Sequence, residues 1–285
     1  MSPLWRDQIQ VFFAPGRIDL VRLPKGLKAV PQPKISAIFE QGTDTALWKT
    51  PIEQLAQLLE KENNARSLKG AELSITLSNH FVRYAVIQFQ QGIKDAQEFF
   101  AYAQFKLREV YGDRVDSWDI SMSDWDPKSG GICAALEREL IQQLQALTVR
   151  FHLRLNQIEP YLTAAFDQWS RAIHQQRFWF IVVEPGRLCV LLFSNGSWTS
   201  IRNQRLLNTV ETELPILLEQ EAIIATQREP VELVFIFAPE HTDMQLPLES
   251  SSWQFNRLPF DGILPPTYFP TSVGDTHKLP VHATT

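Results

Sequence analysis

Cysteine is scarce in this chain of 285 residues, because only Cys133 and Cys189 occur, far apart in sequence. A disulfide framework needs more cysteines, so a reducing compartment is the simpler expectation. No stretch reaches the roughly 18 apolar residues of a membrane-spanning helix. The first residues also lack the apolar segment of a secretory signal. We therefore expect a cytoplasmic protein that does not itself span a membrane.

Positive charge is not in excess either, since 27 Lys and Arg face 32 Asp and Glu, for a net charge of −5. A broad nucleic-acid surface needs clustered Lys and Arg, so no nucleic-acid partner is expected. The chain has no Gly-x-x-x-x-Gly-Lys-Ser/Thr phosphate loop and no Gly-x-Ser-x-Gly nucleophile elbow. Its six histidines are not spaced as metal ligands, so we predict no metal site.

What the chain does contain is enough apolar sequence, 44% of its residues, to build a sizeable core. Apolar runs and alternating patterns predict strands at 8–13, 18–23, 35–39, 72–77, 81–89, 117–125, 132–136, 152–158, 178–183, 188–193, 197–201, 231–237 and 253–258. Apolar residues at helical spacing predict helices at 51–61, 96–111, 136–147, 161–173 and 212–225. This mixture predicts an α/β protein, and its length suggests two domains or two lobes.

An internal repeat organises these elements. Residues 13–23 read Phe-Ala-Pro-Gly-Arg-Ile-Asp-Leu-Val-Arg-Leu, and residues 183–192 read Val-Glu-Pro-Gly-Arg-Leu-Cys-Val-Leu-Leu. Each copy places Pro-Gly-Arg and an apolar residue between two strands, and further strands and helices follow, as a duplicated α/β unit would. The alternative is two unrelated hairpins that share a Pro-Gly turn by chance.

Two lobes that each open with a β-hairpin are the plan of the actin, heat-shock chaperone and sugar-kinase (ASKHA) superfamily. The resemblance predicts an actin-like (ribonuclease H-like) duplicated fold. We place a first lobe with an inserted α/β subdomain at 1–175, a second lobe at 176–258, and a flexible tail rich in Pro, Thr and Gly at 259–285.

In that superfamily the two hairpin turns hold the phosphates of a nucleotide, and the resemblance puts a vestigial nucleotide cleft at the first hairpin turn (residues 14–17) and the second hairpin turn (residues 184–187). Ala14 stands where the superfamily has an Asp, and each turn has a Pro that removes an N–H donor. The candidate site residues are Gly16, Arg17, Glu184, Gly186 and Arg187. Both arginines suit an anion, but we expect solvated turn residues, and no cofactor, although ATP with Mg²⁺ is the alternative.

Several segments resemble the actin-like assembly proteins of type IV pili and type II secretion (the PilM, MshI and GspL group). The segments are 77–89 (Leu-Ser-Asn-His-Phe-Val-Arg-Tyr-Ala-Val-Ile-Gln-Phe), the helix ending Tyr111-Gly112, Trp118, residues 160–169 and the Asn195-Gly196-Ser197-Trp198 hairpin. The resemblance implies a scaffold with a degenerate ATP site. Such an adaptor binds the cytoplasmic segment of an inner-membrane partner and lies at the cytoplasmic face of that membrane.

Two other functions remain open at this stage. One is a nucleotide-binding ASKHA ATPase or small-molecule kinase, which should keep acidic residues in both turns and a Gly-rich adenosine loop near its end. Ala14 and the segment Phe237-Ala238-Pro239-Glu240 depart from that pattern. The other is an unrelated α/β binding module, which survives if the repeat is chance. The sequence therefore favours a non-catalytic adaptor.

Overall fold

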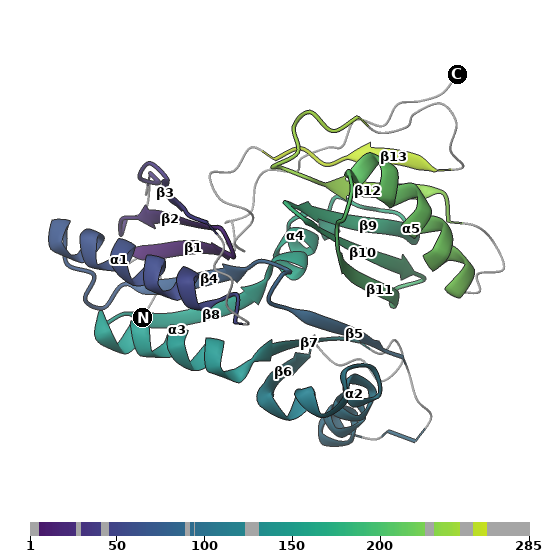
Figure 1. The fold of residues 1–285 in the computed structure, drawn as a ribbon, viewed down its shortest axis with the longest axis horizontal. Coiled ribbons are helices and arrows are strands. Elements are labelled where there is room, and N and C mark those ends of the chain that lie inside the picture. Colours follow the sequence, from purple (N-terminus) through teal and green to yellow (C-terminus); the bar gives the residue numbers. More distant parts are fainter. Residues whose placement is uncertain are drawn as a thin grey trace.

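The computed structural model describes residues 6–26, 30–40, 46–88, 92–93, 95–122, 131–225, 231–245 and 253–260. Over these residues the chain forms two five-stranded sheets and one three-stranded sheet (Figure 1). No helix among them is both long enough and apolar enough to cross a membrane. Residues 261–285, which make up most of the predicted tail, lie outside the described residues.

The first five-stranded sheet has the order β3-β2-β1-β4-β8. Its strands and flanking helices are β1 (Gln8–Ala14), β2 (Arg17–Leu23), β3 (Ile35–Ile38), α1 (Lys49–Ala65), β4 (Glu72–Leu77), β8 (Arg154–Pro160) and α4 (Tyr161–Ser170). The three strands β1 to β3 are antiparallel, and β4 and β8 add to β1 in parallel. The first hairpin turn joins β1 to β2 through Pro15 and Gly16, as the sequence predicts.

The second five-stranded sheet repeats this topology in the order β11-β10-β9-β12-β13. Its elements are β9 (Arg177–Glu184), β10 (Arg187–Ser194), β11 (Ser197–Arg205), α5 (Val210–Ile224), β12 (Leu233–Phe237) and β13 (Gln254–Arg257). A main-chain hydrogen bond from the residue after the third strand to the hairpin glycine also occurs in both sheets. Phe39 N–H donates to the Gly16 carbonyl (3.1 Å), and Leu206 N–H donates to the Gly186 carbonyl (3.0 Å). The chain therefore has the predicted duplicated α/β fold, and the Pro-Gly-Arg repeat marks equivalent positions.

A smaller sheet, β5-β7-β6, lies within the chain between β4 and β8. Its elements, with the helix that leads into β8, are β5 (Arg83–Ile87), α2 (Ala96–Tyr111), β6 (Trp118–Met122), β7 (Gly131–Glu137) and α3 (Arg138–Arg150). Local signals set the ends of α2 as predicted. Asp95 accepts hydrogen bonds from the N–H groups of Gln97 and Glu98, and Gly112 ends the helix with a φ of 65°.

A continuous core joins the two large sheets. Phe12 and Phe237, one from each sheet, both pack edge-on against Tyr161 at the start of α4. Further along α4, Phe166 contacts Phe178 and Trp198 of the second sheet. In Figure 1 α4 accordingly runs between the two sheets, while α5 covers the other face of the second sheet. The lobes therefore share apolar surface directly behind their hairpin turns.

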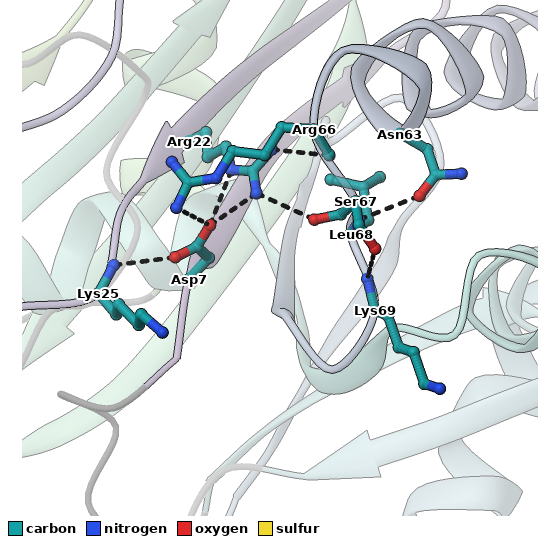
Figure 2. A network of polar contacts seen from close by, with 8 residues as sticks. All are labelled: Asp7, Arg22, Lys25, Asn63, Arg66, Ser67, Leu68 and Lys69. Atoms are coloured by element: carbon teal, nitrogen blue, oxygen red, sulfur yellow. Dashed lines mark hydrogen bonds and ion pairs between the residues drawn. The ribbon is translucent and has the colours of Figure 1, made fainter.

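A buried ion pair fixes the end of the first hairpin that lies away from its turn (Figure 2). Arg22 donates to Asp7 Oδ2 from Nε (3.0 Å) and Nη2 (2.6 Å), and to the carbonyls of Arg66 and Ser67 (3.1 Å each) beyond α1. Burial works to raise the pKa of Asp7, but the Lys25 N–H and the Arg22 guanidinium outweigh it and lower that pKa. This network ties the hairpin to α1 and so helps to orient its turn.

Candidate functional site

The first hairpin turn reaches across to the second lobe through Arg17. This guanidinium pairs with Glu240, which lies just beyond β12, and its Nε lies 3.1 Å from Asp19 Oδ2. Its carbon Cζ also lies 5.2 Å from the centre of the Phe12 ring. Burial works to lower the pKa of Arg17, but the charges of Glu240 and Asp19 outweigh it and raise the pKa. Arg17 is thus an inter-lobe contact.

The second hairpin turn reaches back to the first lobe through Glu184. Its side chain is only 2% exposed, and its Oε2 accepts the main-chain N–H of Asn79, just beyond β4, at 3.0 Å. Burial raises the pKa of Glu184 to about 7, and the charge of Glu240 adds to the rise. Hydrogen bonds from Ser78 and Asn79 offset part of it. Glu184 is therefore largely protonated at mildly acidic pH and about half protonated near pH 7.

These two contacts are similarly placed in the two halves of the chain, although the repeat aligns Arg17 with Arg187 and Glu184 with Ala14. In each case a residue of one hairpin turn contacts the segment that follows the fourth strand in the order of the other lobe's sheet. Arg17 contacts Glu240 after β12, and Glu184 contacts Asn79 after β4. Both turns thus direct a charged or polar group at the opposite lobe. Contacts within the chain therefore involve both of the turns at which the sequence predicts a vestigial nucleotide cleft.

Asn79 joins four elements at this junction. Its Oδ1 accepts the Tyr84 hydroxyl at 2.6 Å and the Leu162 N–H at 3.2 Å, while its carbonyl accepts Asn203 Nδ2 at 2.8 Å. With the bond to Glu184, one residue connects β9, β5, α4 and β11. Because Asn79 is fully buried, loss of the Glu184 carboxyl would leave its main-chain N–H without this partner, at a cost in stability.

Arg187 completes the second turn. Its Nη1 donates to Asn203 Oδ1 at 3.2 Å, and Asn203 Nδ2 donates to the Val82 carbonyl at 3.0 Å. Burial lowers the pKa of Arg187, and the nearby charges of Arg83 and Arg205 lower it further against the opposing effect of Glu184. The preceding Gly186 has a φ of 73°, the left-handed conformation that glycine adopts most easily.

The structure brings the predicted residues Gly16, Arg17, Glu184, Gly186 and Arg187 to one junction, but it corrects the expected exposure of the two arginines. Both are half-buried and bonded, not solvated turn residues, because Arg17 pairs with Glu240 of the other lobe and Arg187 donates to Asn203, although Pro185 and Gly186 themselves are exposed. Sequence reasoning missed Asn79 and Asn203, whose only sequence signals are a Ser-Asn turn and a polar residue in a strand. The predicted nucleotide role of the turns stays a prediction.

Beside the junction lies a small cavity of about 80 Å³, lined by Leu47, Trp48, His80, Phe81, Arg83, Trp118, Ala135 and Glu137. Trp48 Nε1 closes one side by donating to Glu137 Oε2 at 2.6 Å. Burial and then the charges of Arg187, Arg83 and Arg205 lower the pKa of His80 to about 3. His80 is therefore neutral at physiological pH.

Among the described residues no group of three or more His, Cys, Asp or Glu side chains is placed to hold a metal ion.

No protein-family model matches the chain, and no curated protein matches its sequence. Solved structures do match its fold. The cytoplasmic domain of EpsL, an inner membrane component of the type II secretion system of Vibrio cholerae, is 7% identical with a TM-score of 0.57, and the match covers 89% of this chain and 90% of that one. A PilM–PilN type IV pilus biogenesis complex gives 13% identity and a TM-score of 0.63, covering 90% of this chain and 89% of that one.

A third similar structure is a protein with an actin-like ATPase fold and unknown function from Bacteroides thetaiotaomicron. It is 7% identical, with a TM-score of 0.54 and 82% of each chain covered. Identities this low establish the fold alone. The chain therefore has the actin-like fold predicted from its sequence, and the structures that share it include the secretion and pilus proteins to which its segments were compared.

Proposed function

We propose that this chain is a non-catalytic, actin-like adaptor. It binds the cytoplasmic segment of a membrane-anchored partner in a type IV pilus or type II secretion-like machine, at the cytoplasmic face of the inner membrane. The observation that carries the proposal is the pair of contacts by which each hairpin turn holds the opposite lobe, Arg17 with Glu240 and Glu184 with Asn79.

The chemistry of the turns argues against a working nucleotide site. Phosphates at such turns need free main-chain N–H donors, but Pro15 and Pro185 have none and the Asn79 N–H is used by Glu184. A Mg²⁺ ion needs an ionised carboxylate, whereas burial holds Glu184 partly protonated near neutral pH. Ala14 offers no carboxylate at all in the first turn. These features together support the proposal that any ATP site here is degenerate.

The solved structures with a similar fold support the proposed kind of partner. One similar structure is the cytoplasmic domain of an inner membrane component, and another belongs to a complex of PilM with PilN. A rigid two-lobed body with a continuous core between its lobes suits a scaffold, because it presents fixed surfaces to other proteins. Opening and closing around a ligand would instead require the lobes to separate.

The proposal is tested by purifying the tagged full chain from detergent-solubilised membranes of the organism that encodes it. We expect it to co-purify with an integral membrane protein that has a short cytoplasmic segment. A synthetic peptide of that segment should bind the purified chain in calorimetry, while a scrambled peptide of equal composition should not. Release of inorganic phosphate from Mg-ATP by the purified chain, with no membrane protein bound, would contradict the proposal and favour the ATPase or kinase alternative.

A further inference from the structure

Three arginines from three strands converge beside the second hairpin turn: Arg83 of β5, Arg187 of β10 and Arg205 of β11. Arg187 and Arg205 are directly opposite in the β10–β11 ladder. The Val82 carbonyl links them to Arg83, since it accepts Arg83 Nη1 at 3.1 Å and also Asn203 Nδ2, whose own side-chain oxygen accepts Arg187. We call Arg83, Arg187 and Arg205 the arginine cluster.

Among the described residues the arginine cluster forms no ion pair with a carboxylate, although the charge of Glu184 acts on Arg187. Arg6, Arg17, Arg22 and Arg138 each form an ion pair, so the cluster belongs with the described arginines that have none. Like charges directly opposite on neighbouring strands are destabilising, and here they persist in a chain with a net charge of −5. Such an arrangement costs stability in the free protein, and a bound anion would relieve the repulsion.

The half-buried Arg187 also has a side-chain N–H donor without a hydrogen-bond partner among the described residues. Its Nε is buried and has no hydrogen-bond partner among the described residues, although a buried donor of this kind normally has one. The other groups that face it are the buried Glu184 and the neutral His80, so neither supplies a full negative charge at neutral pH. The cluster thus combines unpaired positive charge with an unused donor.

We propose that the arginine cluster binds an acidic, extended segment of the partner protein. Arg187 and Arg205 lie on neighbouring strands of the second sheet, and Arg83 lies on a strand of the smaller sheet that contacts β11. Guanidinium groups match carboxylates with two parallel hydrogen bonds each. An extended segment with carboxylates on alternate residues, roughly 7 Å apart, offers more than one carboxylate to the cluster. This inference rests on the adaptor function proposed above and specifies the chemistry of its partner.

The test uses a fluorescein-labelled peptide of alternating Glu and Ser residues, with the full chain titrated in fluorescence anisotropy. We expect saturable binding at low salt that weakens as ionic strength rises. Arg205→Glu should weaken the affinity at least tenfold, because Arg205 is the exposed member of the cluster. The matched control Arg171→Glu changes an exposed arginine of the α4 end by the same charge and should leave the affinity within twofold.

Thermal unfolding of the same variants separates binding from structure. Replacing Arg205 by Glu removes the repulsion with Arg187 and should raise the Tm, while a merely structural role of Arg205 would lower it. Arg187→Gln should also weaken peptide binding at least tenfold, and Arg205→Glu carries the test alone if that variant does not fold. Equal losses in the Arg171 control, or displacement of the peptide by millimolar inorganic phosphate, would overturn the inference.

Added Mg-ATP distinguishes failure of this inference from failure of the adaptor function. If the peptide does not bind and Mg-ATP leaves the Tm unchanged, only the acidic-segment inference is wrong. If Mg-ATP raises the Tm and displaces the peptide, the cluster is part of a nucleotide site, and both proposals are wrong.

Discussion

Glu184→Gln should stabilise the protein at pH 8 and change it little at pH 5. Folding raises the pKa of the Glu184 carboxyl from about 4.5 in the unfolded chain to about 7. Ionisation of this carboxyl therefore disfavours the folded state, and the free energy of unfolding falls as the pH rises from 4.5 to about 7. At about 1.4 kcal/mol per pKa unit, the full penalty above pH 7 is about 3 kcal/mol. Glutamine cannot ionise, and its side-chain oxygen can still accept the Asn79 N–H.

Urea unfolding of the wild type and the variant at both pH values measures this directly. We expect the variant to be more stable by about 3 kcal/mol at pH 8, and by less than about 1 kcal/mol at pH 5. The matched control Glu219→Gln replaces an exposed glutamate of α5 and should change stability by about 0.5 kcal/mol or less at either pH. A variant less stable than the wild type at pH 8 would contradict this expectation, because it would mean that Glu184 is ionised and stabilised by its neighbours.

The remaining predictions concern single residues and are read by chemical unfolding at pH 7. Arg22→Met should cost about 1.5–3 kcal/mol, because the Asp7 carboxylate loses the Arg22 guanidinium but keeps Arg66 and the Lys25 N–H; a loss below about 1 kcal/mol would contradict the network in Figure 2. Tyr161→Phe should be neutral or slightly stabilising, because the Tyr161 hydroxyl is buried with no hydrogen-bond partner among the described residues. Gly186→Ala should cost about 1–2 kcal/mol, because its φ of 73° disfavours a Cβ atom; an unchanged midpoint would be inconsistent with that turn geometry.

Local signals predicted much of the fold, because they act over a few residues. The Pro-Gly-Arg repeat identified the two hairpins, and Asp95 and Gly112 set the ends of α2. Where the sequence contained no sign of a local conformation, the observed strand or helix begins or ends at a different residue from the predicted one. The strand expected at 152–158 begins at Arg154, because His152 adopts a φ of 54° and completes the turn after α3.

The candidate site was predicted less completely, because its contacts join residues far apart in sequence. Glu184 and Asn79 are separated by 105 positions, and Arg17 and Glu240 by 223. Neither the burial of Glu184 nor the pairing of Arg17 follows from the turn sequences, which look like solvated loops. The arginine cluster likewise depends on β5 meeting the β10–β11 hairpin in space.

If contacts within the chain take the place of nucleotide phosphates at the hairpin turns, Mg-ATP should not bind there. Thermal unfolding of the purified protein with and without millimolar Mg-ATP measures this binding. A ligand at about 100 times its Kd adds about 2.7 kcal/mol of stability, which moves the Tm by several degrees in a protein of this size. We expect an unchanged Tm for a well-folded protein. A clear upward shift that Glu184→Gln abolishes would contradict it and identify the turns as a working nucleotide site.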